Sequence, residues 1–508
     1  MAPYFMMKSA LRQMKSFAKA KGGFLMNIII GNAWPYANGP LHLGRIAVWL
    51  PGDVLARYHR MMGDNVVFVS GTDCHGMPVT NRAEEEGITP LEAVEKYHNE
   101  FQRCFKSLGF SFDIFEKTHS EYHEEKVKEF ILDLYKKGYI YENIEGGVKH
   151  LVFALSKFED KIRDIFENED GWRENAQKIL KRYLDEGLRD KAVTRDFNWG
   201  VDVPLDGYED KKIYVWIEAV MGYVTASMKC LEQRNEDFKS YWSGEDSRIY
   251  FVHGKDNIPF HTVILPAILL GIGIEEPNIR IVSGEHLKLE GKPFSAVKNW
   301  ALWADYITKN YNVDSFRYYL MLNSPEDKDT DFTWRDYINS NNIDLADNLS
   351  KYISKVLSFS RRNYGPGIPN GSINEELKNE ILDLYFEAGD DIEEGHFSSA
   401  LEKIISFCKK SNKDFQENNL WEMIEKNPSK CREKIYNNIQ VIANLSNLLE
   451  PFMPFTCEKI RASLSINEPI WSFIEKKDGI LREANLGIDK IDRKRAADEV
   501  FRLKEKRK

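Results

Sequence analysis

The chain has 508 residues, a net charge of −9, 43% hydrophobic residues and 29% charged residues. This length predicts about two to four domains, and the composition is typical of a soluble globular protein. No apolar run approaches the roughly 18 residues that a membrane helix needs, so we expect a cytoplasmic protein without a membrane partner. The acidic charge argues against a general nucleic-acid coat protein, but it permits a nucleic-acid partner that meets a local basic surface.

The cysteines and the first residues bear on metals and targeting. Six cysteines are scattered without a CxxC pair, which is typical of reduced thiols and supplies no metal cage. Residues 1–25 contain basic residues and no acidic one. We favour a disordered extension over a transit peptide, because the segment is poor in Ser and Arg.

The folded pattern begins with a short apolar strand, Asn27–Ile30, followed by a loop, a helix over Leu41–Met62 and a strand over Val66–Ser70. Strand, helix and strand within about 45 residues predict a βαβ unit with a parallel sheet. Three later apolar segments predict further strands: Ile213–Trp216, Ile249–Val252 and Ile279–Val282.

The segment from Glu116 to Asn198 is mostly helical and charged in pattern, so a helical insertion is expected to split the sheet domain. Helical periodicity from about Tyr337 to Asn447 predicts a helix bundle. The predicted organisation is an extension over 1–25, a Rossmann-like α/β domain over 26–115 and 206–290, the insertion over 116–205, a loop region over 291–336, the bundle over 337–475 and a charged tail over 476–508.

The loop after the first strand carries a candidate phosphate site, Gly31-Asn-Ala-Trp-Pro-Tyr-Ala-Asn-Gly-Pro-Leu-His-Leu-Gly-Arg45. Open parallel sheets bind nucleotides at such strand–helix junctions, because the helix N-terminus presents free N–H groups and the positive end of its dipole. His42 and Arg45 share a helical face on which they can hold a triphosphate, and Gly44 allows close approach. On these residues alone, a plain strand-to-helix turn is the stronger interpretation.

The longer string resembles the methionyl-tRNA synthetase form of the class I synthetase signature, in which Pro-Tyr-Ala-Asn-Gly precedes His-x-Gly-His. Arg45 stands in place of the last His, and arginine differs in length and geometry. The segments Gly71–Gly76, Tyr214–Tyr223 and Val252–His261 resemble the same family. The resemblance covers about Asn27 to Ile474 and implies a class I catalytic domain, split by a connective insertion and followed by an all-α anticodon-binding-type bundle.

The resemblance also implies an activity, methionine adenylation by ATP with Mg²⁺ and transfer to tRNA. The implied catalytic and ATP-binding residues of the strand loops are His42, Gly44, Arg45, Gly254 and Asp256. The implied methionine-binding residues are Trp34, Tyr36, Asp73, Trp216, Ala219, Tyr223 and His261. Asp73 would pair with the ammonium group, and the aromatic rings suit a thioether through burial and sulfur–aromatic contact.

The second family signature, Lys-Met-Ser-Lys-Ser or Lys-Phe-Ser-Lys-Ser, is altered. The matching segment is Glu290-Gly-Lys-Pro-Phe-Ser-Ala-Val-Lys-Asn299, in which both lysines and the second serine are replaced. Losing one such preorganised donor costs about 10²–10³ in rate. Lys292 and Ser295 are the candidate catalytic residues that remain, and Lys298 is a candidate ATP-binding residue.

A second departure concerns zinc. Family members usually insert a CxxC-rich zinc knuckle after the equivalent of Tyr141, whereas residues 142–149 lead directly to His150. A structural zinc site needs about four Cys or His ligands, and this segment supplies none, so we expect no zinc.

The bundle holds the candidate tRNA contacts. Lys351, Lys355 and Arg362 share a helical face, and such a basic stripe can contact phosphates, although a solvated face is an equal alternative on spacing alone. Trp421 matches the family's anticodon-stacking tryptophan, and base stacking is worth roughly 1–3 kcal/mol. Lys351 and Lys355 replace an Asn and an Arg of the family.

Two functions therefore stay open. The retained pocket residues and Asp256 favour a methionine--tRNA ligase of protein biosynthesis, for which we favour a monomer. The altered loop, the missing knuckle and Lys351 favour a catalytically weakened paralogue. Such a protein would bind methionine, adenylate or tRNA as a regulator, or activate an amino acid for another acceptor.

Overall fold

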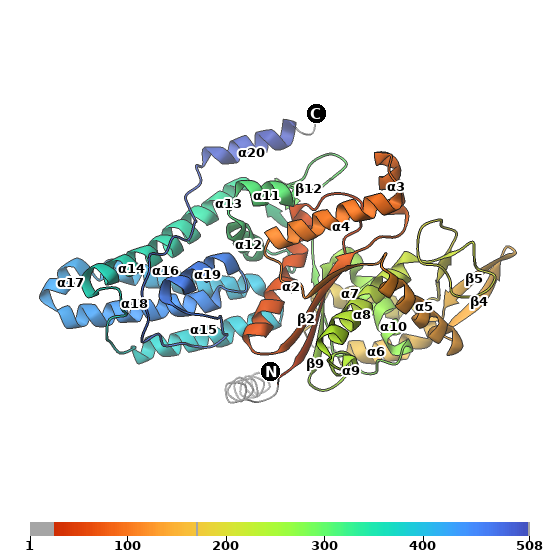
Figure 1. The fold of residues 1–508 in the computed structure, drawn as a ribbon, viewed down its shortest axis with the longest axis horizontal. Coiled ribbons are helices and arrows are strands. Elements are labelled where there is room, and N and C mark those ends of the chain that lie inside the picture. The colour runs from red at the N-terminus through yellow and green to blue at the C-terminus, as the bar shows by residue number, and fades with distance from the viewer. Residues whose placement is uncertain (1–24, 169–170, 506–508) are drawn as a thin grey trace.

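The computed structural model describes residues 25–168 and 171–505, so nearly all of the predicted extension over 1–25 lies outside the described residues. Its centre is a five-stranded parallel sheet in the order β10-β9-β1-β2-β3 (Figure 1). The strands are β1 (Asn27–Asn32), β2 (Asn65–Thr72), β3 (Ile114–Lys117), β9 (Ser247–Gly254) and β10 (Ile279–Gly284). Because the chain leaves β1 toward β2 and returns on its other side at β9, the strand order reverses at β1. Open α/β sheets bind ligands at such a switch point.

Successive side chains of β1 enter two different cores. Ile28 and Ile30 pack with one cluster, Ile29 packs with the other, and all three are fully buried. Burial on both faces explains why the strand is a continuous apolar run. The first face is covered by α2 (Leu43–Met61) and α4 (Pro90–Ser107), and the second by α8 (Val215–Arg234) and α10 (Leu265–Gly271).

The predicted strand over Ile213–Trp216 is wrong. Only β8 (Lys212–Ile213) is extended, and α8 begins at Val215. The second half of the apolar run, Val215 and Trp216, begins a helix that is buried on most sides, and a short apolar run does not distinguish such a helix from a buried strand. The other strand and helix predictions of the sheet domain are confirmed, with helix α2 two residues shorter at its start than predicted.

The insertion contains a small antiparallel sheet in addition to helices. Its elements are α5 (Glu121–Lys136), β4 (Ile140–Glu145), β5 (Val148–Phe153), η1 (Leu155–Phe158), α6 (Glu159–Glu167), α7 (Glu174–Glu186), β6 (Lys191–Ala192) and β7 (Thr194–Arg195). Gly146 and Gly147, both with positive φ, close the β4–β5 hairpin. The hairpin was missed because Ile144 and Val148 near its tip are exposed, which removes the apolar alternation of a half-buried strand.

The helical part begins after a second small sheet. The sheet domain also contains α3 (Met77–Glu86), α9 (Phe238–Trp242), η2 (Lys255–Asn257) and η3 (Phe260–Ile264). The second small sheet consists of β11 (Leu287–Leu289), β12 (Lys292–Pro293) and β13 (Thr330–Phe332), with α11 (Ala304–Asn310) and α12 (Val313–Leu322) between β12 and β13 in the chain. It is followed by α13 (Trp334–Ser340), η4 (Asn341–Ser350) and α14 (Lys351–Tyr364). The remaining helices are α15 (Glu375–Glu393), α16 (Phe397–Glu417), α17 (Leu420–Lys426), α18 (Pro428–Leu448), α19 (Pro454–Leu464) and α20 (Lys494–Glu505). Helices α14 to α19 form the bundle, and the chain then returns to place α20 beside α13 and α11 (Figure 1).

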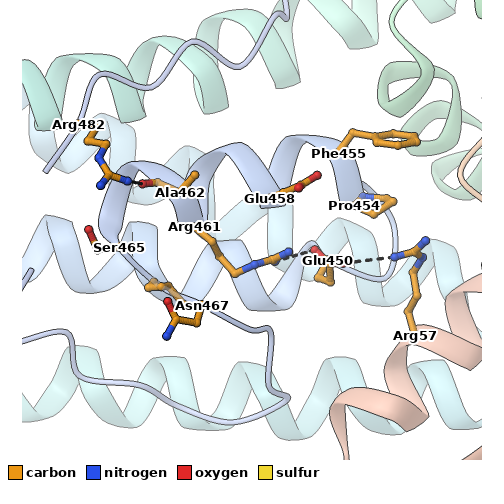
Figure 2. A pocket seen from close by; sticks show the side chains of 11 residues that line it. Arg57, Glu450, Pro454, Phe455, Glu458, Arg461, Ala462, Ser465, Asn467 and Arg482 are labelled. Carbon is orange, nitrogen blue, oxygen red and sulfur yellow. Dashed lines mark hydrogen bonds and ion pairs between the residues drawn. The ribbon is translucent and has the colours of Figure 1, made fainter. Parts of the chain in front are cut away.

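Buried charges fix the bundle to the sheet domain. Asp53 on α2 pairs with Arg317 on α12 at 2.6 Å and with Arg57 at 2.8 Å. Glu450 accepts from Arg57 at 3.3 Å and from Arg461 at 2.6 Å, and so links α2 to α19 (Figure 2). Burial alone would raise the pKa of Asp53, but the two arginines beside it hold that pKa well below its ordinary value. Within the described ranges, no helix is long and apolar enough to cross a membrane.

Candidate active site

A cleft of about 460 Å³ opens where β1, β2 and β9 end, at the switch point of the sheet. Among the residues that line it are the candidates predicted on the strand loops and on α8: Trp34, Tyr36, His42, Gly44, Arg45, Asp73, Trp216, Ala219, Tyr223, Gly254, Asp256 and His261. Those on α8 come together because positions 216, 219 and 223 recur on one face of a helix. Segments that are far apart in the sequence therefore meet in one hollow.

Asp73 is the buried carboxylate of this cleft. It follows β2, is 4% exposed, and its backbone pairs with the loop that holds Tyr36. The Tyr36 hydroxyl donates to its carboxylate, and no lysine or arginine within the described part of the chain forms an ion pair with it. Burial first, and then the charge of Glu218, raise the pKa of Asp73 well above its ordinary value. A cationic amine entering the cleft would relieve this cost.

Aromatic rings form the wall beside Asp73. Tyr223 meets Trp34 edge-on at 6.3 Å between ring centroids, and Trp216 meets Tyr36 edge-on at 6.1 Å. Phe260, which the sequence did not single out, stacks on Trp216 at 4.0 Å. The cleft is therefore apolar and aromatic next to one carboxylate, which is the environment that a side chain such as a thioether with a neighbouring ammonium requires.

Two glycines make room for Trp34. A Cβ at Gly71 would lie 2.4 Å from the Trp34 ring, and a Cβ at Gly222 would lie 3.0 Å from it. Gly71 is in β2 and Gly222 is in α8, so the indole is inserted between the sheet and the helix. Any larger residue at Gly71 would displace the ring and change the depth of the cleft.

His261 is held as a neutral acceptor. Its Nδ1 lies 2.8 Å from the carbonyl oxygen of Asn257, which can only accept, so the ring proton is on Nδ1. Its Nε2 then accepts from the Tyr223 hydroxyl at 2.8 Å. Burial lowers the pKa of His261 to about 4, in agreement with a neutral ring. The pair fixes the position of Tyr223 at the end of the aromatic wall.

The nucleotide candidates lie along the other side of the cleft. His42 is the residue before α2, and burial, followed by the charge of Arg45, lowers its pKa to about 3. Its Nδ1 is buried without a protein partner. Asp256 lies at the rim, with its side chain 80% exposed and 4.0 Å from His286. A neutral imidazole and the first turn of α2 thus face the cleft, where the Leu43 N–H donates to the carbonyl oxygen of Leu302 and the Arg45 N–H to that of His42.

The altered loop closes on α2 through Phe294. The Phe294 ring stacks on His42 with 5.1 Å between centroids, and a Cβ at Gly44 would lie 2.8 Å from it. Pro293 and Phe294 line the cleft, whereas the candidates Lys292, Ser295 and Lys298 do not. The Lys292 ammonium lies 5.0 Å from the centre of the Trp300 ring, and the Lys298 amide donates to Ser295 Oγ.

Lys288 lines the cleft and was missed by the sequence reasoning. It is the middle residue of β11, and its ammonium lies 3.3 Å from Asp329. Asp329 also accepts from Lys255 at 3.0 Å, and Lys255 pairs with Glu285 at 2.6 Å. The signal was the alternation Leu287-Lys-Leu289, which puts two buried leucines on one face of a strand and the lysine on the other.

A larger hollow of about 670 Å³ lies between α2 and α19 (Figure 2). Its arginines are already engaged, Arg57 and Arg461 by Glu450 and Arg482 by the carbonyl oxygen of Ala462. None of the predicted site residues lines it. We therefore assign the site to the smaller cleft at the strand ends.

Residues 28–148 and 145–357 match the family described as tRNA synthetases class I (M). The chain is 42% identical to the methionine--tRNA ligase of Bacillus cereus (strain B4264) over 540 residues, which cover 94% of this chain and 99% of that protein. The chain belongs to the methionyl-tRNA synthetase family. It is also 40% identical to methionine--tRNA ligase 1 of Alkaliphilus oremlandii (strain OhILAs), across 94% of this chain and 100% of that one.

A solved structure of the same family shares the fold. The Mycobacterium tuberculosis methionyl-tRNA synthetase in complex with methionyl-adenylate superimposes with a TM-score of 0.81 at 24% identity, covering 90% of this chain and 98% of that one. The predicted fold class, a Rossmann-like catalytic domain with an insertion and a helical bundle, is confirmed. The family assignment made from the sequence motifs is confirmed as well.

The candidate tRNA residues lie away from the cleft, on α14 and on α17, toward the far end of the bundle (Figure 1). Trp421 is 58% exposed, and the Arg362 guanidinium lies 6.0 Å from its ring centre. Lys351 is also exposed and pairs with Asp347 at 2.5 Å. Lys355 shares the helix with Lys351, one turn further on. The exposed indole next to a cation is available to a stacked base.

Proposed function

We propose that this chain activates methionine with ATP and transfers the methionyl group to tRNA. The observation that carries the proposal is Asp73, a buried carboxylate without a cationic partner in the described ranges, beside an aromatic wall at the switch point of the sheet. Family membership supports the same activity. We also propose a monomer in the cytoplasm.

Recognition of methionine follows from this arrangement. Asp73 pairs with the ammonium group, whose burial without a counter-charge would be strongly unfavourable. Trp34, Tyr36, Trp216, Ala219, Tyr223 and His261 enclose the thioether. Because His261 is neutral and engaged with Tyr223, it adds no charge that would favour a polar side chain.

The nucleotide lies on the opposite wall, with its phosphates at the N-terminus of α2. His42, Gly44 and Arg45 contact the phosphates, and Gly254 and Asp256 hold the ribose. ATP enters with Mg²⁺ on its phosphates. A carboxylate oxygen of methionine attacks the α-phosphorus in line and pyrophosphate leaves. A terminal hydroxyl of tRNA then attacks the carbonyl carbon of the adenylate, loses its proton and forms an ester, and AMP leaves as the acyl–phosphate bond breaks. Catalysis rests on positioning and on stabilising charge, because no covalent nucleophile of the protein is needed.

A cation must reach the phosphates during the attack, and the two loop lysines lie outside the cleft. Lys292, Ser295 and Lys298 act only if the loop moves off its present contacts with His42 and Trp300. Lys288 needs no such movement, because it lines the cleft and its partner Asp329 is shared with Lys255. We therefore propose Lys288 as the principal cation and the loop residues as secondary contributors.

The deciding experiment is amino-acid-dependent pyrophosphate exchange with a panel of amino acids, followed by aminoacylation of tRNA. We expect exchange with methionine, and a higher rate in the double variant Ala296→Lys and Val297→Ser, which restores the second lysine and the second serine of the family signature. Val297 is 99% exposed, so its replacement does not disturb the core. Absence of exchange in both proteins, with any amino acid, would contradict the proposal.

A second function is favoured by one observation, the stacking of Phe294 on His42 where phosphates would bind. In that alternative the chain binds methionine, an adenylate or tRNA as a regulator, or serves a different acceptor. It predicts methionine binding without pyrophosphate exchange, or exchange without charging of tRNA. At the bundle, Lys351, Lys355, Arg362 and Trp421 would contact tRNA under either function.

A further inference from the structure

Three potential ligand atoms converge behind the amino-acid cleft. His75 follows β2, His119 lies just before α5, and Glu124 is in the first turn of α5. His75 Nε2 lies 3.3 Å from His119 Nδ1, and His119 Nδ1 lies 2.9 Å from Glu124 Oε1. The three atoms all lie within 4.8 Å of one another. His75 is buried, whereas the side chains of His119 and Glu124 are 32% and 24% exposed, so the cluster faces solvent on one side.

The three ligand atoms have fewer hydrogen-bond donors among them than acceptors. The other ring nitrogen of His75, Nδ1, lies 3.3 Å from a carboxylate oxygen of Glu218, which can only accept. The proton of a neutral His75 is therefore on Nδ1, and its Nε2 presents a lone pair to His119. His119 Nδ1 can donate one proton, either to His75 or to Glu124. With both rings neutral, one of the two acceptors, His75 Nε2 or the Glu124 carboxylate, lacks a donor from the other two groups.

A divalent cation would satisfy all three atoms at once. Tetrahedral zinc has bonds of roughly 2.0–2.2 Å to histidine nitrogen and carboxylate oxygen, which places neighbouring ligand atoms about 3.3 Å apart. The observed 3.3 Å and 2.9 Å separations are close to that value. Two imidazoles favour zinc over magnesium or calcium, which prefer oxygen ligands.

The surroundings resemble those of a metal site. A carboxylate that accepts from the far nitrogen of a ligating histidine fixes its orientation and tautomer, and Glu218 has this relation to His75. Glu218 is itself fixed at 2.8 Å by His123, also from α5. The Trp199 ring, 4.6 Å from that of His119, forms one wall. We infer that His75, His119 and Glu124 bind one Zn²⁺, with a water molecule at the solvent-facing fourth position.

This site would differ from the zinc knuckle in ligands and in place. The expectation of no zinc considered only the segment between Tyr141 and His150, whereas these ligands join the end of β2 to the start of α5. The backbone N–H of His75 lies 3.4 Å from Asp73 Oδ1, so the ion would hold the segment that carries the proposed ammonium ligand. Its role would be to position that segment, and binding of zinc does not depend on adenylation.

The test uses the full chain without a histidine tag, freed of metal with a chelator and titrated with Zn²⁺ and with Co²⁺ as a visible probe. We expect about one ion per chain and a rise in the melting temperature on addition of zinc. Glu124→Gln and His119→Ala should each weaken binding by at least about tenfold. His150→Ala is the matched control, because His150 lies on β5 in the insertion, outside the cluster.

Two results would overturn the inference. One is a metal-free chain that takes up no Zn²⁺ at micromolar concentration. The other is equal binding by the parent, His119→Ala and Glu124→Gln, which would place the ion elsewhere. Glu124→Gln keeps the size of the side chain, so it remains informative if His119→Ala is unstable. Because the readouts are metal content and the cobalt spectrum, the result is separate from pyrophosphate exchange.

Discussion

The ring of Phe294 lies flat on the imidazole of His42, with 5.1 Å between the ring centroids and 13° between the planes. This contact joins the altered signature loop to His42, the residue that precedes α2. Phe294 and His42 line the same end of the cleft, so ATP bound there as proposed would have to displace the Phe294 ring. The stack is therefore part of the free energy of ATP binding.

Replacing Phe294 by Ala should tighten ATP binding. An aromatic pair is worth about 0.5–1.5 kcal/mol, so its loss should lower the dissociation constant of ATP by roughly two- to tenfold. Calorimetric titration with ATP measures this, with Phe501→Ala as a control at an exposed phenylalanine of α20. Unchanged or weaker ATP binding would show that the stack persists beside the nucleotide.

Asp73→Asn should abolish measurable methionine binding while the fold is kept, because the amide is similar in size but carries no charge for the buried ammonium. We expect a loss of more than about 100-fold, of the size seen when one partner of a buried charge pair is removed. Calorimetry with methionine and the circular dichroism spectrum of the variant check both parts. Unchanged affinity would remove Asp73 from the amino-acid site.

Lys288→Ala should lower the rate of pyrophosphate exchange by about 10²–10³ while methionine affinity is unchanged, because the cation acts chiefly on charge in the transition state. Lys292→Ala should have a smaller effect, since its ammonium lies over Trp300 and outside the cleft. Steady-state exchange at saturating substrates compares the two variants. A larger effect at Lys292 would show that the loop moves into the site during the reaction.

His261 should make the fold less stable in acid. Its pKa is about 4 in the folded chain and 6.5 as its ordinary value, because burial disfavours the charged ring. Between these values the unfolded chain binds the proton more readily, so stability falls as pH decreases from 6.5 toward 4. Below both pKa values, the free energy of unfolding is lower by about 3 kcal/mol, because each unit of pKa difference corresponds to about 1.36 kcal/mol. Denaturant unfolding at several pH values measures this effect. The free energy of unfolding should fall less steeply with decreasing pH in His261→Gln than in the parent protein.

Trp421→Ala should reduce kcat/KM for tRNA charging by about ten- to one hundredfold, since stacking of a base is worth roughly 1–3 kcal/mol. Pyrophosphate exchange should be unaffected, because α17 lies far from the cleft (Figure 1). Trp421 is 58% exposed, so the substitution should leave the bundle folded. Equal charging of tRNA by both proteins would leave Trp421 without a role in recognition.

The sequence predicted the strands of the central sheet well because apolar runs such as that of β1 are local patterns. The cleft candidates from Trp34 to His261 came from the family resemblance, and the structure brings them together at the strand ends. The strand predicted at Ile213–Trp216 failed because four apolar residues have no period. The place of Lys288 depends on the pairing of β11 with β13, a long-range contact that the local sequence does not specify.

Helix α2 connects the cleft at the strand ends to the helical bundle. His42 precedes its first turn in the cleft, and Arg57 near its other end meets Glu450 of the bundle. A helix of 19 residues is about 28 Å long. When such a helix tilts, a displacement at one end is accompanied by a displacement of comparable size at the other end. A movement at the Arg57 end of α2 can therefore be transmitted along the helix to the His42 end. Under the proposed function, a tRNA that displaced the bundle would, through the contact of Arg57 with Glu450, also displace the first turn of α2 at the cleft.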